Sequence, residues 1–248
     1  MKRKFTLFIM LAVFSWYVNA QVMVKDIWTG SSSSSPYDFT NVNSTLYFIA
    51  NDSTNGMELW KSDGTAAGTV MVKDINPGTS GSSSYYLTNV NGTLFFVAYN
   101  GTIGYELWKS DGTAAGTVKV TGSVYANPVI NNLTNVNGTL YFQALGTNVG
   151  LWKSDGTAAG TVMVKNINYS SSNPANFTNV NGTLYFSVNR NELWKSDGTA
   201  AGTVMVSTVG NMYGPSYFTN VNGTLFFYYT RNKKLHSQIE EKLTNRFC

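Results

Sequence analysis

The sequence predicts an all-β fold: a β-propeller of about five four-stranded blades, with the last blade shared between the N- and C-terminal segments. The motif LWKSDGTAAGTV occurs four times without substitution, starting at residues 59, 107, 151 and 193. A second motif, TNVNGTL or a close variant, starts at residues 40, 88, 134, 178 and 219. A period of about 40 to 50 residues is typical of propellers, solenoids and arrays. Consecutive apolar residues after Leu94, Leu140 and Leu184 predict strands covered on both faces, as stacked blades require.

Each repeat divides into four short segments separated by turn signals, as the second copy illustrates. Strands are predicted there at residues 86–90, 93–98, 105–109 and 117–120. Asn91-Gly92 joins the first two segments, and this dipeptide favours a type I′ hairpin because both of its residues tolerate a positive φ. The longer turn from Ser110 to Gly116 supplies an aspartate that accepts backbone hydrogen bonds and glycines suited to a tight return. Each repeat is therefore predicted to be one antiparallel sheet.

The two ends of the repeat array complement one another. The segment Val22–Ile27 (VMVKDI) matches the fourth-strand segments that start at Val70 and Val162. Residues 217–229 supply a first and a second strand that no tryptophan motif follows. We therefore expect Val22–Ile27 to pair in the blade begun by residues 217–229, because this pairing closes the ring and removes exposed strand edges. The alternative is an incomplete ring that belongs to a longer array.

The third strand of the shared blade has three alternatives. Lys234–Ser237 stands at the right distance after Leu225 to replace Glu-Leu-Trp-Lys, although it is a poor copy. The region 233–243 is instead rich in helix formers and would place Leu235 and Ile239 on one helical stripe. A tail that is foreign to the repeat, from a truncation or a change of reading frame, is the third alternative.

The chain divides into three segments. Residues 1–20 have the pattern of a secretory signal peptide, with three basic residues followed by an apolar run and a small-residue cleavage site. The apolar run is shorter than the ~20 residues of a membrane-spanning helix, which favours a cleaved leader over an N-terminal anchor. Residues 21–230 form the predicted propeller domain and residues 231–248 an atypical tail. The protein is therefore expected to be secreted or at the cell surface, without a membrane span after cleavage.

Composition and charge exclude several functional classes. Of 17 basic residues, three belong to the leader, which leaves 14 against 13 acidic residues. No basic stripe of the kind that neutralises phosphates is present, so nucleic acid is not an expected partner. The single cysteine, Cys248, and the single histidine, His236, allow neither an intrachain disulfide nor a zinc cluster. No cofactor is predicted, and calcium has no support beyond the repeated aspartates.

The four copies of Leu-Trp-Lys-Ser-Asp-Gly-Thr, three of them preceded by glutamate, resemble the ELWxxDGT repeat family of exported bacterial proteins. The resemblance spans residues 22 to about 229, and one copy departs from the motif with Gly150 in place of glutamate. It implies a secreted or surface repeat protein, often part of a larger adhesin-like polypeptide. In architecture alone, the predicted ring is also similar to five-bladed lectin propellers of the tachylectin type.

Two interpretations of the repeated motif are open. In the structural one, tryptophan fills the space between blades and aspartate ties the turn. In the functional one, each copy presents an indole face and an Asp-Gly loop to a ligand, because aromatic rings stack on sugars and carboxylates bind hydroxyls or calcium. The candidate ligand-binding residues are Trp60, Asp63, Trp108, Asp111, Trp152, Asp155, Trp194 and Asp197. Exposure of the tryptophans discriminates between the two interpretations.

The predicted function is a multivalent binding module for glycan or protein ligands, because identical sites on a ring favour multivalent targets. The alternatives are a purely structural surface or matrix scaffold and, third, a glycan-processing enzyme. Of the 13 acidic residues, only Asp38, Asp52, Glu240 and Glu241 lie outside the repeat. A catalytic pair needs carboxyls in different environments, which repeat-equivalent acids do not offer. The protein is therefore predicted not to be an enzyme, and no catalytic residue is assigned.

Overall fold

The computed structural model describes residues 22–102, 104–120, 129–145, 149–167, 174–208, 215–231 and 234–236. Within these ranges the chain folds into five antiparallel sheets and contains no α-helix. Four sheets have four strands and the fifth has three. No helix in this part of the chain is long and apolar enough to cross a membrane. The predicted leader, residues 1–20, and the end of the predicted tail, residues 237–248, lie outside the described residues.

Each sheet is formed by strands that are consecutive in the sequence. The first sheet contains β1 (Tyr37–Val42), β2 (Thr45–Asn51), β3 (Met57–Ser62) and β4 (Val70–Lys73). The second contains β5 (Tyr85–Val90), β6 (Thr93–Tyr99), β7 (Tyr105–Ser110) and β8 (Val118–Lys119). The third contains β9 (Val129–Val136), β10 (Thr139–Leu145), β11 (Gly150–Ser154) and β12 (Val162–Asn166). The fourth contains β13 (Ala175–Val180), β14 (Thr183–Val188), the 3-10 turn η1 (Asn189–Asn191), β15 (Glu192–Ser196) and β16 (Val204–Thr208). The fifth contains β17 (Ser216–Val221), β18 (Thr224–Arg231) and β19 (Lys234–His236).

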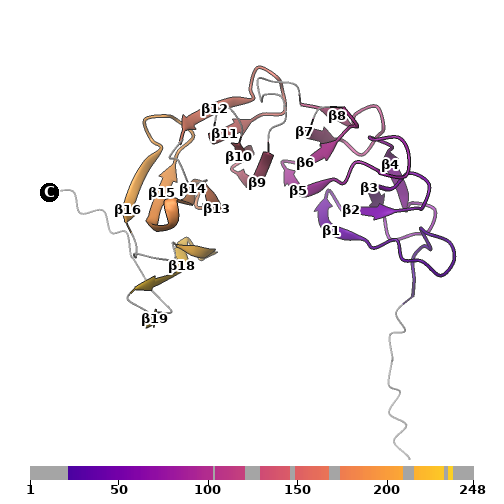
Figure 1. Ribbon diagram of the computed structural model, residues 1–248, viewed down its shortest axis with the longest axis horizontal. Coiled ribbons are helices and arrows are strands. Elements are labelled where there is room, and N and C mark those ends of the chain that lie inside the picture. Colours follow the sequence, from indigo (N-terminus) through magenta and orange to yellow (C-terminus); the bar gives the residue numbers. More distant parts are fainter. Residues whose placement is uncertain are drawn as a thin grey trace, which may run out of the picture.

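The five sheets follow one another along a curved arc (Figure 1). The first strand of each sheet contacts the first strand of the next, from β1 through β5, β9 and β13 to β17. These strands face the inner side of the arc, and the fourth strands β4, β8, β12 and β16 lie on its outer side (Figure 1). This is the arrangement of blades around an axis that the repeat predicts.

The first hairpin of each sheet forms as the Asn-Gly dipeptides predict. In the second sheet, φ is 49° at Asn91 and 83° at Gly92, which are the two positive angles of a type I′ turn. The first sheet has Ser44 in place of the glycine, and this serine also adopts a positive φ of 65°. A non-glycine residue in this region costs about 1 kcal/mol, which the pairing of β1 with β2 offsets.

The hydrophobic core lies between neighbouring sheets. In one cluster, Ile49 and Leu59 of the first sheet pack with Phe96 and Trp108 of the second. Equivalent clusters join the second sheet to the third and the third to the fourth. The second strands are therefore apolar on both faces because a sheet covers each face, as the sequence predicts.

The predicted pairing of Val22–Ile27 with the last sheet is not formed. These residues carry no strand, and the last sheet has the order β17-β18-β19. The arc is open: β18 and β19 lie at one end, and the indigo N-terminal residues lie beside the first sheet at the other end (Figure 1). β19 covers only three residues, and His236 lies opposite Tyr229 as Glu106 lies opposite Ala98. β19 therefore ends before the position of the motif tryptophan, which pairs with the fourth strand in other sheets, as Trp60 pairs with Met71.

Residues 234–236 form a strand, β19, rather than the start of a helix, but not in the predicted register, which put Lys234 in the place of the motif glutamate. β19 pairs antiparallel with β18, and Tyr229 lies opposite His236. In the second sheet the equivalent partners are Ala98 and Glu106, so His236 takes the place of the motif glutamate. β18 and β19 therefore extend the sheet beyond residue 230, the predicted domain boundary.

Candidate functional site

The turn after each tryptophan motif is held by the side chains of the motif itself. In the second sheet, Asp111 Oδ1 accepts hydrogen bonds from the backbone N–H and the hydroxyl of Thr113, both at 2.8 Å. Ser110 Oγ lies 2.7 Å from Thr117 Oγ1, and both side chains are buried. A Cβ on Gly116 would overlap the Asp111 carboxylate, so only glycine fits. The other three copies form the same bonds. The sequence of the motif is the same in all four copies because its residues contact one another.

The four candidate aspartates are exposed at the tips of these turns, one in each of four sheets: Asp63, Asp111, Asp155 and Asp197. Hydrogen bonds from the threonine two residues later lower the pKa of each carboxyl below its usual value. The structure does not bring the four carboxylates together. In the described ranges no group of three or more His, Cys, Asp or Glu side chains could hold a metal ion.

The four candidate tryptophans are buried, with exposed fractions of 4 to 7%: Trp60, Trp108, Trp152 and Trp194. Three of them stack on a phenylalanine of their own sheet, with ring centroids 6.2 to 6.5 Å apart. Lys73 of the preceding sheet covers Trp108, with Nζ 5.9 Å from the ring centroid. The indole rings therefore fill the space between sheets and present no face to a ligand. This corrects the expectation that they form stacking platforms.

The glutamate of the first copy lies in a polar, solvent-free pocket between β3 and the connection to the second sheet. Glu58 is fully buried and accepts hydrogen bonds from the backbone N–H of Asn76 (3.0 Å) and from Ser82 Oγ (2.6 Å). Burial raises the pKa of the Glu58 carboxyl to about 7. Ser82 Oγ lies 2.8 Å from Ser84 Oγ, and the Ser84 carbonyl accepts a hydrogen bond from the hydroxyl of Tyr37. Ser84 thus contacts both the hydrogen-bond network of the buried acid, through its hydroxyl, and Tyr37, through its backbone carbonyl.

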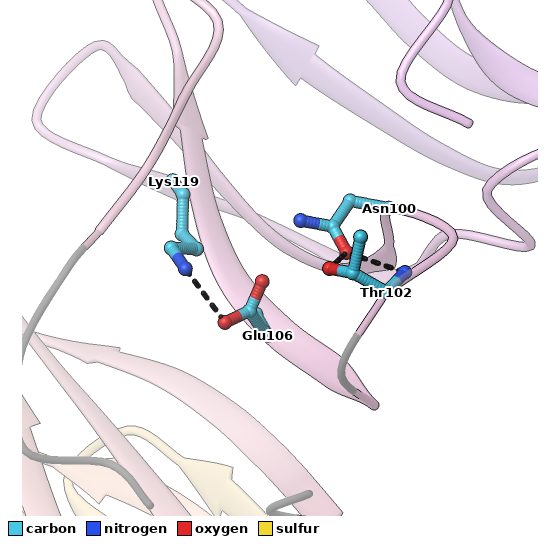
Figure 2. Close-up of polar contacts among 4 residues, drawn as sticks. All are labelled: Asn100, Thr102, Glu106 and Lys119. Carbon is cyan, nitrogen blue, oxygen red and sulfur yellow. Dashed lines mark hydrogen bonds and ion pairs between the residues drawn. The ribbon is translucent and has the colours of Figure 1, made fainter. Parts of the chain in front are cut away.

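The same glutamate has other partners in the other copies. Glu106 forms an ion pair with Lys119 at 2.8 Å, as Figure 2 shows. Glu192 accepts a hydrogen bond from the indole N–H of Trp194 at 2.9 Å. The third copy has Gly150 at this position, where a Cβ would overlap a backbone carbonyl oxygen of β12. Equivalent positions in the sequence therefore do not have equivalent environments.

Five tyrosines gather where the first and second sheets meet, and we call them the tyrosine patch: Tyr37, Tyr85, Tyr86, Tyr99 and Tyr105. The strands place them, because β5 and β7 start at the same edge of the second sheet at which β6 ends. The Tyr85 and Tyr105 rings lie 5.2 Å apart, and Tyr99 lies 5.9 Å from Tyr105. Tyr37, Tyr86 and Tyr105 are exposed, with fractions of 36 to 41%.

Tyr86 has a backbone conformation that tyrosine rarely adopts. It lies at a bulge in β5 with a φ of 60°. The other sheets have the same bulge, with Asp38, Asn132 and Asn176 at this position in three of them. Their side chains bond to the next sheet; for example, Asn176 Nδ2 donates to the Pro215 carbonyl at 3.3 Å. The fifth sheet also has a tyrosine here, Tyr217, with a φ of 54°. Asparagine suits both the positive φ and this bond, and tyrosine offers neither advantage.

Polar groups border the tyrosine patch. The Tyr37 hydroxyl donates to the Ser84 carbonyl at 2.9 Å. Burial, with Asp38 and Tyr105 nearby, raises the pKa of Tyr37. The turn between β6 and β7 is held by Asn100, whose Oδ1 accepts from the backbone N–H and the hydroxyl of Thr102 (Figure 2). Burial, with Tyr105 and Tyr86 nearby, raises the pKa of Tyr85 to about 12, so the Tyr85 hydroxyl is uncharged at neutral pH.

Sequence reasoning missed the tyrosine patch because it searched within the repeated motifs. The patch lies outside them, just before the TNVNG block and at the end of the second strand and the start of the third. The available signal was the pair Tyr85-Tyr86, where aligned copies have Asn131-Asn132 or Ala175-Asn176. Tyrosine stands at two of the five equivalent positions, Tyr86 and Tyr217, so this signal alone does not single out the second copy.

Comparison with known proteins identifies the fold. No protein-family model and no curated protein matches the sequence, so the ELWxxDGT resemblance stays a prediction. Among solved structures, puromycin hydrolase is similar, with a TM-score of 0.57 at 13% identity over 82% of this chain and 35% of that one. A mutant of the same enzyme complexed with PGG gives 0.52 at 13% identity over 78% and 33%.

The fold is a β-propeller. The predicted fold class is thereby confirmed, and the sheets are its blades. The chain spans about a third of the length of the puromycin hydrolase chains. At this identity the likeness shows the fold alone. An α-L-arabinofuranosidase from Clostridium thermocellum aligns with 77% of this propeller and 80% of its own chain at 16% identity, but its TM-score of 0.36 supports no argument.

The prediction that the protein is not an enzyme is corrected by these comparisons. The propellers to which the chain is similar include a hydrolase, so the fold gives no ground for excluding catalysis. The prediction assumed that repeat-equivalent acids share one environment. Glu58, buried with a raised pKa, and Glu106, paired with Lys119, show that they do not.

Proposed function

We propose that the protein is an exported or surface-exposed β-propeller that binds carbohydrate at the tyrosine patch. The gathering of Tyr37, Tyr85, Tyr86, Tyr99 and Tyr105 from two adjacent blades carries this proposal. The placement of Tyr86 adds weight, because its positive φ costs free energy that asparagine would avoid at this bulge.

Carbohydrate is the ligand class that matches this chemistry. Sugar rings have apolar C–H faces that stack on aromatic rings, while their hydroxyls bond to polar groups at the ring edges. The tyrosine patch offers exposed rings, the phenolic hydroxyls of Tyr86 and Tyr105, and Asp38 close by. Lys119 is paired with Glu106, which makes it less available to an anionic ligand. Neutral glycans are therefore the first ligands to test.

Export supports an extracellular ligand. The leader pattern at residues 1–20 and the resemblance of the repeats to exported bacterial proteins both favour this location. The single cysteine is also consistent with a fold that depends on packing between blades in any redox compartment.

The test is a glycan array probed with the purified protein, followed by titration of the best ligand into variants. We expect Tyr105→Ala and Tyr86→Asn each to weaken binding by about 10-fold, because each removes a stacking face worth about 0.5–1.5 kcal/mol in addition to its buried apolar area. Both side chains are more than a third exposed, so the variants should remain folded.

Tyr217→Asn is the matched control. Tyr217 occupies the same bulge in the fifth blade, has a φ of 54° and is 81% exposed, but lies outside the tyrosine patch. This variant should bind like the wild type. Equal binding by the wild type, Tyr105→Ala and Tyr86→Asn would refute the proposal, as would an array on which no glycan binds.

A further inference from the structure

The blades at the two ends of the open arc each have a face that no other blade of the chain covers (Figure 1). We call the uncovered face of the first blade the leading face, formed by Phe39 of β1 and Leu46 of β2. We call the uncovered face of the fifth blade the trailing face, formed by Val221 of β17 and Phe226 of β18. Both faces have counterparts at the junctions inside the molecule, which show what each packs against beside a neighbouring blade.

The leading face is exposed where its counterparts are buried. Leu46 is 39% exposed, whereas the equivalent leucines of the next three blades are fully buried: Leu94, Leu140 and Leu184. Phe39 is 58% exposed, whereas its equivalent Leu87 is 7% exposed. Ile27 packs against the cluster that contains Trp60, and it leaves Phe39 and Leu46 uncovered.

The trailing face shows the complementary difference. Val221 is 46% exposed, whereas the equivalent valines of the other four blades are 4 to 7% exposed: Val42, Val90, Val136 and Val180. At the first junction, Val42 lies in one cluster with Leu94 of the next blade. The next two junctions contain the same pair: Val90 with Leu140, and Val136 with Leu184. Val221 and Leu46 are thus the two members of such a pair, each without its partner.

A second contact of the junctions joins an aromatic residue of the second strand to the motif turn of the next blade. The Phe95 ring lies against Gly156, where a Cβ would be 3.0 Å from it. Tyrosine hydroxyls take the same position at two other junctions: Tyr47 against Gly112 and Tyr141 against Gly198. In the first blade, no atom lies within 4 Å of the equivalent position on Gly64. The fifth blade has Phe226 at the position of Phe95, so it carries the ring that fits there.

A third contact is the side-chain amide that links the first strands. Asn89 Nδ2 donates to the Asn41 carbonyl at 2.9 Å, and the same bond recurs at the other three junctions. Among the described residues, the Asn41 amide has no acceptor and the Asn220 carbonyl has no side-chain donor. The two end blades therefore carry both partners of a fifth bond.

We propose that copies of this chain associate head to tail, with the trailing face of one copy packed against the leading face of the next. Within one chain the two faces lie at opposite ends of the open arc (Figure 1). A second copy supplies each face with the contacts that form the junctions inside the molecule. Exposed apolar faces of this kind mark interaction sites, and this contact is heterologous, so further copies can add.

Ser44 makes this junction weaker than the internal ones. In the other hairpins the equivalent glycine lies against an asparagine amide of the preceding blade, as Gly138 lies against Asn91 Nδ2. A Cβ at this position meets that amide, so Ser44 requires the exposed Asn222 side chain to turn aside. Association should therefore depend on concentration, with a single copy in dilute solution.

The first test is the mass of the purified protein, measured by light scattering over a range of concentrations. We expect the wild type to shift from one copy to two or more as concentration rises. Val221→Asp and Leu46→Asp should each remain a single copy over the same range, because the contact would bury an unpaired carboxylate. Both side chains are more than a third exposed in the single chain, so the variants should remain folded.

The second test mixes the two variants in equal amounts. Leu46→Asp keeps an intact trailing face and Val221→Asp keeps an intact leading face. The mixture should therefore form pairs and nothing larger, whereas each variant alone stays single. A variant that had lost its fold would not restore these pairs.

Val162→Asp is the matched control. Val162 is 39% exposed and belongs to β12 on the outer side of the arc (Figure 1), so this variant should associate like the wild type. A wild type that is a single copy at all concentrations would overturn the proposal, as expected if the ring closed within one chain. Normal association of Val221→Asp, or a mixture that stays single, would overturn it as well.

Discussion

At the residue scale, Glu58 is the acid whose environment departs most from that of its repeat-mates. Its side chain is fully buried, and its partners Asn76 and Ser82 are neutral. The nearby Asp74 raises the pKa of Glu58 further, and no cation is among the groups that lower this pKa. The carboxyl is therefore held in a site that makes its protonated form more favourable than it is in water.

This environment predicts a pH dependence of stability. The pKa of Glu58 is about 7 in the folded state against 4.5 normally, so between these values the folded protein holds a proton that the unfolded chain has released. Stability should therefore fall as the pH rises from about 4.5 to 7, by roughly 1–3 kcal/mol. Chemical denaturation at several pH values measures this change.

Glu58→Gln isolates the contribution of this residue, because glutamine keeps an oxygen for the Asn76 N–H and does not titrate. The variant should lose the decline between pH 4.5 and 7, while Glu106→Gln should retain it. The turn aspartates titrate below this window, because their pKa values are lowered. A Glu58→Gln variant with the wild-type slope would show that another group is responsible.

A second prediction at this scale concerns the bulge residue of the first strand. Tyr86→Asn should leave the free energy of unfolding unchanged or slightly higher, since relief of about 1 kcal/mol of backbone strain offsets the lost ring contact. The reciprocal change, Asn176→Tyr, should destabilise by about 1–3 kcal/mol, because it adds strain and removes the hydrogen bonds to Ser187 and Pro215. Similar destabilisation by both changes would mean that Tyr86 is needed for folding.

At the element scale, the Asn-Gly hairpins link the blades as well as turning the chain. Asn135 Nδ2 donates to the Asn89 carbonyl of the preceding blade at 2.9 Å, while its Oδ1 accepts from the Gly138 N–H. The same pair of bonds recurs at the other first strands from Asn89 to Asn220. The first asparagine of each TNVNG block therefore serves both its own hairpin and the junction between blades.

This ladder predicts that Asn135→Ala destabilises the protein by about 1–2 kcal/mol, because it removes two hydrogen bonds and leaves the Asn89 carbonyl without its donor. Asn41→Ala is the control, since the Asn41 side chain has no hydrogen-bond partner within the described residues and is exposed. Thermal unfolding should show a lower Tm for Asn135→Ala alone. Equal effects of the two changes would contradict the role of the ladder.

Elements fixed by local sequence were predictable and elements fixed by distant pairing were not. The hairpins follow from Asn-Gly, which selects its turn without tertiary help, and the covered second strands follow from their apolar pattern. The fourth strand at Val22–Ile27 carries the right residues, but its formation depends on a third strand that β19 supplies only in part. A segment with the sequence of a strand forms one only where a neighbouring strand is available to pair with it.

At the scale of the whole molecule, the repeated residues build the propeller and unrepeated residues distinguish one blade junction from the others. The tryptophan–phenylalanine pair Trp108–Phe96 has an equivalent in every complete blade, because the space between neighbouring blades is the same at each junction. The tyrosine patch occurs at the junction of the first two blades, where Tyr37 of the first blade lies near Tyr105 and bonds to the Ser84 carbonyl. The repeated motif therefore did not predict the candidate site. Its tyrosines are far apart in the sequence, and the pairing of β5, β6 and β7 brings those of the second blade together.

The central claim is that the ligand binds at the tyrosine patch and not at the repeated motif. Its most direct test is hydrogen exchange of the protein with and without its best glycan from the array. Binding at the tyrosine patch should slow backbone exchange in segments 84–88 and 99–106, and leave the motif turns 63–68, 111–116, 155–160 and 197–202 unchanged. Slower exchange at those four turns, with none at the patch, would contradict the account and return the ligand site to the repeated motif.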